Sequence, residues 1–302
     1  MEITFSVSGV HTWLWLPPLV AFCISFFTSM AGVTGAFMLL PFQVSVLGFT
    51  SPAVSATNLV YNIIASPSGI FRFLREKRLI WPLALIVILG TLPGVVIGGF
   101  IRLHWLPDPE QFKVFAGFFL LYIGVRLVAG ARHNMSESGI LRLNHNHDFN
   151  IDLINVSWPA LRYRFQGHEY RCGYVGLFSL SLVVGVLGSI YGIGGGAVIA
   201  PFLVSMYRLP VHTVAGATLL STFATSAAGI IFYLSAAPFY GDITIRPDWM
   251  LGALFGLGGL FGIYLGSRTQ RYVSAFWLKM LLGFIVLLVS CKYLIPLLDL
   301  PR

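Results

Sequence analysis

Long apolar stretches alternate with short polar connections along the whole chain. The apolar stretches cover approximately residues 13–48, 52–74, 79–101, 111–131, 173–206, 211–236, 249–267 and 275–297. A helix needs about 20 residues to cross ~30 Å of hydrocarbon, and most of the stretches have about that length. The stretches 13–48 and 173–206 are too long for one straight span, and each holds a cluster of glycine and proline. The pattern predicts an all-α polytopic membrane protein with two interrupted spans.

Composition supports a membrane protein. Of the 302 residues, 57% are hydrophobic and 10% are charged, whereas soluble domains are roughly 45–50% apolar and about 25% charged. No Lys or Arg precedes residues 13–31 and no small-residue cleavage pattern follows them, so we interpret them as a first membrane segment rather than a signal peptide. The three cysteines are far apart and predict neither a disulfide framework nor a metal or redox pair.

The chain has a formal net charge of +8, and nine of its 19 Lys and Arg residues lie in two connections. The loop 72–78 holds Arg72, Arg75, Lys77 and Arg78, and the insert 131–173 holds Arg132, Arg142, Arg162, Arg164 and Arg171. Positive charge is enriched in the cytoplasmic loops of membrane proteins. We therefore expect both connections to be cytoplasmic, and we expect no nucleic-acid partner.

The chain contains an internal repeat. A shift of 160 residues aligns "GVTGAFMLLPFQVS" (Gly32–Ser45) with "GIGGGAVIAPFLVS" (Gly192–Ser205) without a gap. We therefore divide the chain into a first transmembrane repeat (1–131), a cytoplasmic linker (132–171) and a second transmembrane repeat (172–302). Duplicated halves with Gly/Pro-interrupted segments at matching positions are typical of secondary transporters, whose substrate site lies between the repeats.

The two halves could run in the same direction or be inverted. A single span over 13–48 gives four segments per half and parallel repeats, whereas a break at Gly32–Gly35 gives five segments per half and inverted repeats. A continuous helix over 13–48 would be about 54 Å long, which is far more than the bilayer core. We therefore favour two inverted repeats of about five helical segments each, with short, broken helices meeting at the midplane.

The glycine clusters predict an anion site. Unwound backbone inside a bilayer is tolerated only where it is buried in protein or lines a wet cavity. A helix that restarts after a break in "YGIGGGAVIAPF" (Tyr191–Phe202) would direct free N–H groups and about half a positive charge toward the gap. Such a helix end binds anions without a lysine. In an inverted repeat, "AGVTGAF" supplies a second end from the opposite side.

Hydroxyl and amide side chains follow each break and suit an oxyanion. The substrate-binding candidates are Gly32, Gly35, Thr57, Asn58, Asn62, Gly194, Gly195, Gly196, Thr218, Ser221 and Thr222. The alternative is that small residues simply let helices pack closely. We expect packing to explain isolated glycines such as Gly98, Gly99 and those in the range 256–262.

Acidic residues provide an independent argument about the substrate. All 11 Asp and Glu lie in loops or at segment ends, so none is placed to meet a cation within the membrane. In the insert, "NHNHD" (Asn144–Asp148) could bind a transition metal through His145, His147 and Asp148. No ligand set of known spacing completes this group, so we interpret it as a solvated loop and expect no metal site and no cofactor.

The repeated "G-x-x-G-A/G-x-x-x-x-P-F" motif, "SATN" (Ser55–Asn58) and "AGATLLST" (Ala215–Thr222) resemble the TauE/SafE family of membrane permeases. The resemblance covers the chain except the insert. It implies transport of sulfite and related sulfur-containing organic anions across the bacterial inner membrane, often outward. The residues that match the repeated motif are Gly32, Gly35, Pro41, Gly192, Gly194, Gly195, Gly196 and Pro201. Thr34 and Ala36 stand where the second half has glycines, so the two half-sites are expected to be unequal.

Together these observations predict a secondary transporter that exports sulfite or a related organosulfonate anion by alternating access. A passive anion channel and a metal-ion permease stay open as alternatives, and so does a homodimer. No HExxH or GxSxG motif and no acid pair lies within a span. We therefore expect no enzymatic activity and no catalytic residues, with a small anion and the lipid bilayer as the partners.

Overall fold

The computed structural model describes residues 2–30, 34–76, 79–141, 151–157, 160–165, 167–241, 243–269, 273 and 275–298. The first half contains α1 (Leu16–Met30), α2 (Ala36–Ser45), α3 (Ala53–Arg75), α4 (Trp81–His104) and α5 (Pro109–Leu141). The second half contains α6 (Tyr174–Tyr191), α7 (Gly195–Met206), α8 (Val211–Ala236), α9 (Trp249–Thr269) and α10 (Ala275–Leu298), with a 3-10 turn η1 (Ala237–Phe239) after α8. The all-α class and the five helices per half are confirmed over these residues.

The helices have the lengths that a multi-pass membrane protein needs. Six of them, α4, α5, α6, α8, α9 and α10, contain stretches long and apolar enough to cross a bilayer. The helices α1, α2 and α7 are shorter. The two long apolar stretches of the sequence are therefore each divided into two helices.

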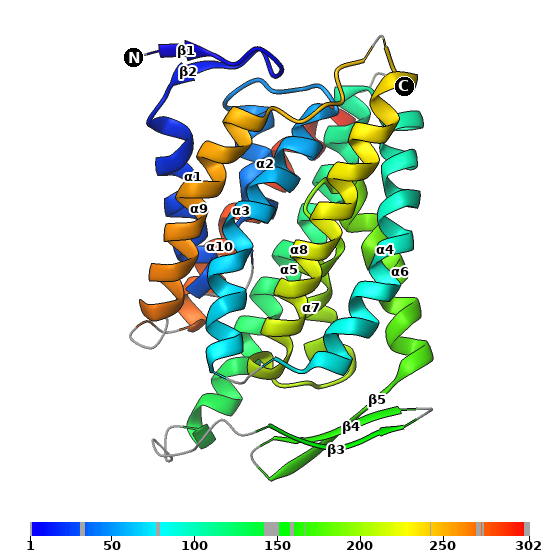
Figure 1. The fold of residues 1–302 in the computed structure, drawn as a ribbon. Helices are drawn as coiled ribbons and strands as arrows, with labels where there is room; N and C mark the ends of the chain where they lie inside the picture. Colours follow the sequence, from blue (N-terminus) through cyan, green and yellow to red (C-terminus); the bar gives the residue numbers. More distant parts are fainter. Residues whose placement is uncertain are drawn as a thin grey trace.

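Two helix pairs join the halves through closely approaching backbones. A Cβ placed at Gly94 of α4 would lie 2.6 Å from the carbonyl oxygen of Leu182 in α6. In the same way, a Cβ at Gly262 of α9 would lie 2.5 Å from the carbonyl oxygen of Phe22 in α1. Because backbone cannot move aside as a flexible side chain can, only glycine fits these crossings. Each half therefore packs its fourth helix against the first helix of the other half (Figure 1).

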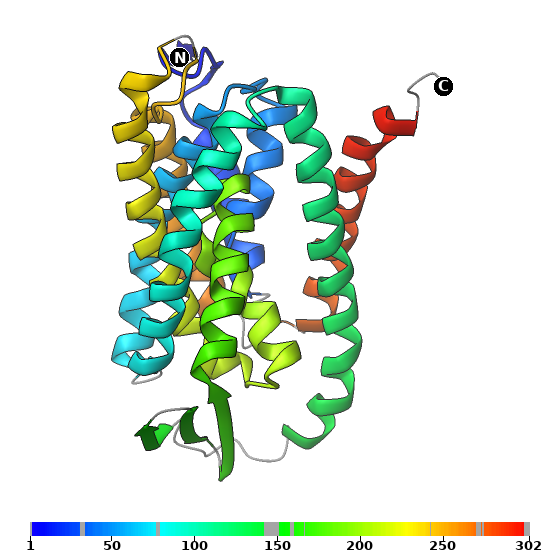
Figure 2. The same cartoon turned by 90° about the vertical axis from the view of Figure 1, so that its right-hand side faces the viewer.

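The helices α5 and α10 form a further pair that stands at one flank of the bundle (Figure 2). The Ser290 hydroxyl of α10 donates to the carbonyl of Gly117 in α5 over 2.8 Å. The pair also reaches inward, because the Tyr293 and Ser45 hydroxyls lie 2.7 Å apart and join α10 to α2.

Equivalent helices begin at opposite ends of the bundle. In Figure 1, α1 starts next to the N-terminal hairpin, whereas α6 starts at the other end, directly after β5. This arrangement is the one expected of inverted repeats, and a two-fold relation between the halves stays a prediction.

The insert forms an antiparallel sheet of β3 (Ile151–Ser157), β4 (Ala160–Phe165) and β5 (His168–Gly173), with β4 in the centre. The alternating residues Leu161, Tyr163 and Phe165 of β4 are buried, as the period of a half-buried strand requires. The hydroxyls of Tyr163 and Thr213 lie 2.9 Å apart, which fixes the sheet beneath the start of α8 (Figure 1). Before the sheet, α5 continues to Leu141, beyond the boundary expected at residue 131.

A second, smaller sheet lies at the opposite end of the bundle. It pairs β1 (Glu2–Thr4) with β2 (His11–Trp13). The backbone N–H and the hydroxyl of Ser8 both donate to one carboxylate oxygen of Asp248, over 3.1 and 2.9 Å. The other oxygen accepts from the Leu251 N–H over 3.0 Å and caps the start of α9.

Candidate functional site

The predicted interruption in the second half is present. Helix α6 ends at Tyr191, and the next residue, Gly192, has a left-handed backbone with φ of 82°. The Gly188 carbonyl accepts from the N–H groups of both Gly192 and Ile193 over 2.9 Å, which closes the end of the helix. Gly194 also has a positive φ, of 75°, and α7 begins at Gly195. Glycines at 192 and 194 therefore supply conformations that other residues rarely adopt.

The interruption in the first half is described only from Thr34 onward. Gly35, the residue before α2, has φ of −70° and not a left-handed conformation. A Cβ at Gly35 would lie 2.7 Å from the Tyr61 hydroxyl and 3.0 Å from the Ser25 hydroxyl. These two hydroxyls lie 2.8 Å apart and are buried. Glycine is needed at this position for close approach. Its repeat counterpart, Gly195, also lacks a positive φ. Gly32, the counterpart of Gly192, lies outside the described residues, so the inequality of the half-sites stays a prediction.

The side chain of Asn58 in α3 joins the two interruptions. Its amide nitrogen donates to the carbonyl of Ala36 in α2 over 3.1 Å and to the carbonyl of Gly192 over 3.0 Å. One turn later in α3, the Asn62 amide donates to the carbonyl of Ile193 over 2.9 Å. Both amides are buried, and they satisfy the carbonyls of Gly192 and Ile193, which lie between the end of α6 and the start of α7.

Further contacts hold the interruptions against each other. The Tyr191 hydroxyl at the end of α6 donates to the carbonyl of Phe37 in α2 over 2.9 Å. The Gln43 amide nitrogen lies 3.4 Å from the Asn58 side-chain oxygen, and Gln43 is fully buried. The C-terminal end of α6, the start of α2 and the middle of α3 therefore form one buried polar cluster, although α6 and α2 are far apart in sequence.

Helix α8 covers the start of α7. A Cβ at Gly196 would lie 2.3 Å from the backbone nitrogen of Thr222, and one at Gly195 would lie 2.8 Å from the Cα of Gly185. A Cβ at Gly194 would lie 2.9 Å from the Ser226 hydroxyl. The glycines predicted for the site thus bring the first turn of α7 against the backbones of α6 and α8.

The hydroxyls of α8 are mostly engaged within that helix. Thr218 donates to Ala215 over 3.1 Å, and Thr222 donates to Thr218 over 2.9 Å. The Ser221 hydroxyl lies 3.2 Å from that of Thr91 in α4. The buried Ser226 hydroxyl, in contrast, has no hydrogen-bond partner in the described part of the chain. It is therefore the α8 donor that is available beside Gly194.

The predicted residues do not all meet. Asn58, Asn62, Gly194, Gly195, Gly196, Thr218, Ser221 and Thr222 lie around the second interruption, and Gly35 lies at the first. Thr57 is in another place, because its hydroxyl accepts from the N–H of Asp248 over 2.9 Å and faces the start of α9. Whether these residues bind substrate stays a prediction.

The electrostatics of the second interruption favour a negative ligand. Among the described residues, no acceptor pairs with the N–H groups of Gly195 and Gly196 at the start of α7. Such N–H groups carry the positive end of the helix dipole. The buried carboxylate of the described chain, Asp248, is engaged at the start of α9. The described residues also contain no group of three side chains that could hold a metal ion, and His145, His147 and Asp148 lie outside them.

Sequence reasoning missed Arg102, near the end of α4. Arg102 is fully buried, and its Nε lies 3.5 Å from the Ser55 hydroxyl. A Cβ at Gly192 would lie 2.6 Å from the Cα of Ser55, so Arg102 is one residue removed from the interruption. The available signal was an arginine directly after a glycine-rich apolar stretch, but arginines at the ends of spans usually reach the membrane surface.

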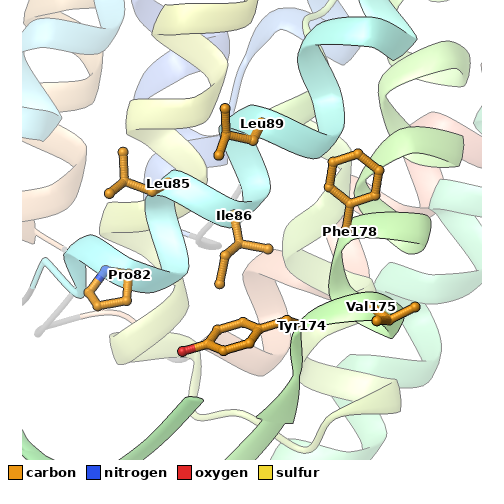
Figure 3. A pocket seen from close by; sticks show the side chains of 7 residues that line it. All are labelled: Pro82, Leu85, Ile86, Leu89, Tyr174, Val175 and Phe178. Carbon is orange, nitrogen blue, oxygen red and sulfur yellow. The ribbon is translucent and has the colours of Figure 1, made fainter. Parts of the chain in front are cut away.

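An apolar pocket of about 560 Å³ lies elsewhere (Figure 3). It is lined by residues near the starts of α4 and α6, among them Leu85, Leu89 and Phe178. On α6 the pocket reaches only to Phe178, which precedes Tyr191 at the end of the helix by more than three helical turns. The pocket is therefore remote from the interruption, and its lining does not suit an anion.

Comparison with known proteins agrees with this architecture. The family model "Sulfite exporter TauE/SafE" matches residues 18–293. The probable membrane transporter protein YunE of Bacillus subtilis is 23% identical over 277 residues, which cover 87% of this chain and 91% of the relative. The probable membrane transporter protein y4hK of Sinorhizobium fredii is 25% identical over 251 residues, covering 82% and 85%.

No solved structure is significantly similar to the chain. The family match extends over both halves and includes both interruptions. The ten helices, the interrupted spans and this match lead to one conclusion: the chain is a multi-pass membrane transporter and belongs to the TauE/SafE family.

Proposed function

We propose that the protein is a secondary transporter that exports sulfite or a related organosulfonate anion by alternating access. The observation that carries this proposal is the start of α7, where unpaired N–H groups and the unpartnered Ser226 hydroxyl are buried together. A buried helix N-terminus without a nearby carboxylate is suited to an anion. Sulfite as the substrate rests on the description of the family.

Burial of the site supports alternating access. Asn58, Asn62 and Thr222 are at most 1% exposed, so neither membrane face has open access to the interruption in this conformation. An anion can reach the start of α7 only if helices rearrange around the glycine breaks. A rearrangement of one half against the other around a fixed site is the usual mechanism of such repeats.

The orientation that we propose places the larger sheet in the cytoplasm of a bacterial cell. Arg72 and Arg75 at the end of α3 lie at the same end of the bundle as the sheet, which carries Arg162, Arg164 and Arg171 (Figure 1). Both connections that the positive-inside rule assigns to the cytoplasm are thus on one face. The N-terminal hairpin then lies outside the inner membrane.

Flux measurements in proteoliposomes test the proposed function. Purified wild-type protein should carry radiolabelled sulfite at alkaline pH, where leakage of neutral sulfur dioxide is small, and the flux should saturate with concentration. Ser226→Ala removes the available hydroxyl without adding volume and should raise the KM for sulfite several-fold. Gly195→Leu and Asn58→Leu should abolish flux, and Gly130→Ala, at a position with no atom within 4 Å of the new Cβ, is the control.

The results also separate a carrier from a channel. A carrier gives slow, saturating flux and no large conductance, whereas a channel gives currents of many ions per second. Large sulfite currents would contradict alternating access. Sulfite flux that is unaffected by Gly195→Leu and Asn58→Leu would contradict the proposed site, and no sulfite flux from folded wild-type protein would contradict the proposed substrate.

A further inference from the structure

Arg102 is a buried charge without a carboxylate partner among the described residues. Its side chain is 0% exposed, and the described ion pairs do not include it. Charged side chains inside a membrane protein are costly and are usually paired or functional. The position of Arg102 therefore raises the question of which group neutralises its charge.

Part of the guanidinium is satisfied by neutral neighbours. The Nη1 group donates to the carbonyl of Leu106, and the planar group lies 3.8 Å from the centre of the Phe112 ring. The Nε group points to the Ser55 hydroxyl. The Nη2 group is buried and has no hydrogen-bond partner in the described chain. The Leu106, Phe112 and Ser55 contacts explain how the side chain is held, but they supply no negative charge.

A second buried donor lies nearby. Tyr233 of α8 is fully buried, and its hydroxyl makes no hydrogen bond of normal geometry within the described residues but is close enough to Ser55 and Arg102 to interact with both. It belongs to the same buried cluster as Ala56 and Leu103, which are the neighbours of Ser55 and Arg102 in sequence. Arg102, Tyr233 and Ser55 thus bring three donor side chains from α4, α8 and α3 into one buried region.

Two helix ends set the local potential. Arg102 lies in the last turn of α4, whose negative end offsets part of its charge but supplies no full counter-charge. Ser55 lies in the first turn of α3, which starts at Ala53. The start of a helix is the positive end of its dipole, so it does not add to this compensation. A buried guanidinium beside such a helix end favours an anion on electrostatic grounds, and its fork of N–H groups matches two oxygens of an oxyanion.

The position of Arg102 relates it to the interruption of the second half. Ser55 contacts Gly192, as described above, and the Phe112 ring lies 6.4 Å from the ring of Tyr191, centre to centre. Helix α4 ends at the face of the bundle that carries the N-terminal hairpin (Figure 1). Arg102 is therefore next to the interruption, on the side toward that face.

We propose that Arg102, Ser55 and Tyr233 form a second binding station for a small oxyanion, between the glycine interruption and the face with the N-terminal hairpin. The inference rests on the proposed function for the identity of the anion, which is sulfite or a related sulfur oxyanion. Nη2 of Arg102 and the Tyr233 hydroxyl bind the oxygens of the anion, and Ser55 lies between this station and Gly192. The station attracts an anion with the full positive charge of Arg102, whereas the neutral groups around α7 attract it only with their dipoles.

Binding by the purified full-length protein in detergent tests the station. The probe is sodium sulfite, titrated against sodium gluconate at equal ionic strength, with the thermal unfolding midpoint as the readout. Arg102→Gln should raise the apparent Kd for sulfite by at least about tenfold, because it removes a charge-assisted hydrogen bond. Arg102→Lys should restore part of the affinity, since it keeps the charge but not the fork. Arg268→Gln, the same change at an exposed arginine of α9, should leave the Kd unchanged.

The neutral members of the station give a second test. Ser55→Ala and Tyr233→Phe together keep the charge and almost all of the volume, and they should raise the apparent Kd about threefold or more. This double variant decides the question if Arg102→Gln does not fold. A folded Arg102→Gln protein, or a folded double variant, that binds sulfite as the wild type does would overturn the station.

Flux separates this inference from the proposed function. Sulfite binding that depends on Arg102, without sulfite flux by the wild type, supports the station and contradicts the transport proposal. Sulfite flux with a KM that Arg102→Gln does not change supports transport and overturns the station. Wild-type protein that neither binds nor transports sulfite overturns both.

Discussion

The Asn58 side chain and the Gly192 carbonyl form a hydrogen bond of 3.0 Å that joins α3 of the first half to the interrupted span of the second. The same amide nitrogen also donates to Ala36, at the start of α2. One side chain therefore holds two interruptions that lie far apart in sequence. The bond gives the glycine breaks a fixed relation to each other, which a binding site between them would require.

Loss of this amide should destabilise the protein. Asn58→Leu removes the bond to the Ala36 carbonyl and leaves the Gly192 carbonyl buried without a partner, at a cost of about 1–3 kcal/mol for the latter. Ser68→Ala is the control, because the Ser68 hydroxyl donates to the carbonyl of Ala65 in its own helix and joins no other helix among the described residues. Unfolding midpoints in detergent should fall clearly for Asn58→Leu and by little for Ser68→Ala. Equal midpoints would show that Asn58 does not hold the interruptions.

The left-handed turn at Gly192 should not tolerate a side chain. An alanine there costs about 1–2 kcal/mol in backbone strain, and its Cβ would lie 2.6 Å from the Cα of Ser55. Gly192→Ala should therefore reduce both stability and flux. Gly130→Ala should leave stability unchanged or raise it by about 0.5–1 kcal/mol, since Gly130 is helical and no atom lies within 4 Å of the new Cβ. If Gly192→Ala were as stable as Gly130→Ala, the left-handed turn at Gly192 would not have the role proposed for it.

Alanine substitutions at the two crossings between the halves should destabilise the protein to a similar extent. Gly94→Ala forces α4 away from α6, and Gly262→Ala forces α9 away from α1. Overpacking of this kind costs about 1–3 kcal/mol. Unfolding midpoints measured side by side should fall by similar amounts, and the double variant should show the sum of both losses. A large loss for one variant and none for the other would show that the crossings are not equivalent.

Docking of the larger sheet should weaken at alkaline pH. Burial raises the pKa of Tyr163 well above its ordinary value and raises the pKa of Cys172 to about 11. Because the undocked groups ionise at lower pH than the docked ones, the docking energy is constant below these ordinary values and falls as the pH rises above them. Proteolysis of the sheet should therefore accelerate above about pH 9–10.

Tyr163→Phe provides the control for this pH dependence. The variant loses the hydrogen bond to Thr213, so docking at neutral pH should weaken by about 0.5–1.5 kcal/mol. Its alkaline response should be smaller than that of the wild type, because only Cys172 of the two groups still titrates. Identical pH profiles for the two proteins would rule out Tyr163 as the main titrating group.

The proposed orientation can be measured by labelling cysteines with a membrane-impermeant maleimide. Cys23, Cys172 and Cys291 are first replaced, and then Ser6→Cys on the hairpin or His168→Cys on the larger sheet is added; both positions are exposed. In intact spheroplasts, only the hairpin cysteine should react, and both should react after permeabilisation. Labelling of the sheet cysteine alone would reverse the orientation.

Much of the architecture could be predicted from local sequence. The length of the stretch 173–206 and the glycines inside it required a break, and the structure has one between Tyr191 and Gly195. Asn58 and Asn62 were expected near the breaks because they follow the first one in sequence, and both lie beside the second interruption. The bonds of their amides to carbonyls of other helices could not be predicted, since those bonds depend on how the helices pack.

Other features depend entirely on tertiary packing. Arg102 follows an apolar stretch, and such a position usually reaches the membrane surface. Its burial depends on neighbours from other helices, among them Phe112 of α5 and Ser55 of α3. The strand pattern of Leu161, Tyr163 and Phe165 was visible as an alternation of polar and apolar residues. The alternation did not reveal that Thr213 would hold this strand against the bundle.

The exchange of helices between the halves has a consequence for how the protein is made. When the ribosome has completed α4, the glycine face of that helix has no partner, because α6 has not yet been synthesised. The first half must wait in the bilayer, with α1 and α4 both lacking their final neighbours, until α6 and α9 emerge. Neither half is therefore expected to mature alone, and the two halves expressed as separate chains should assemble only when they are produced together.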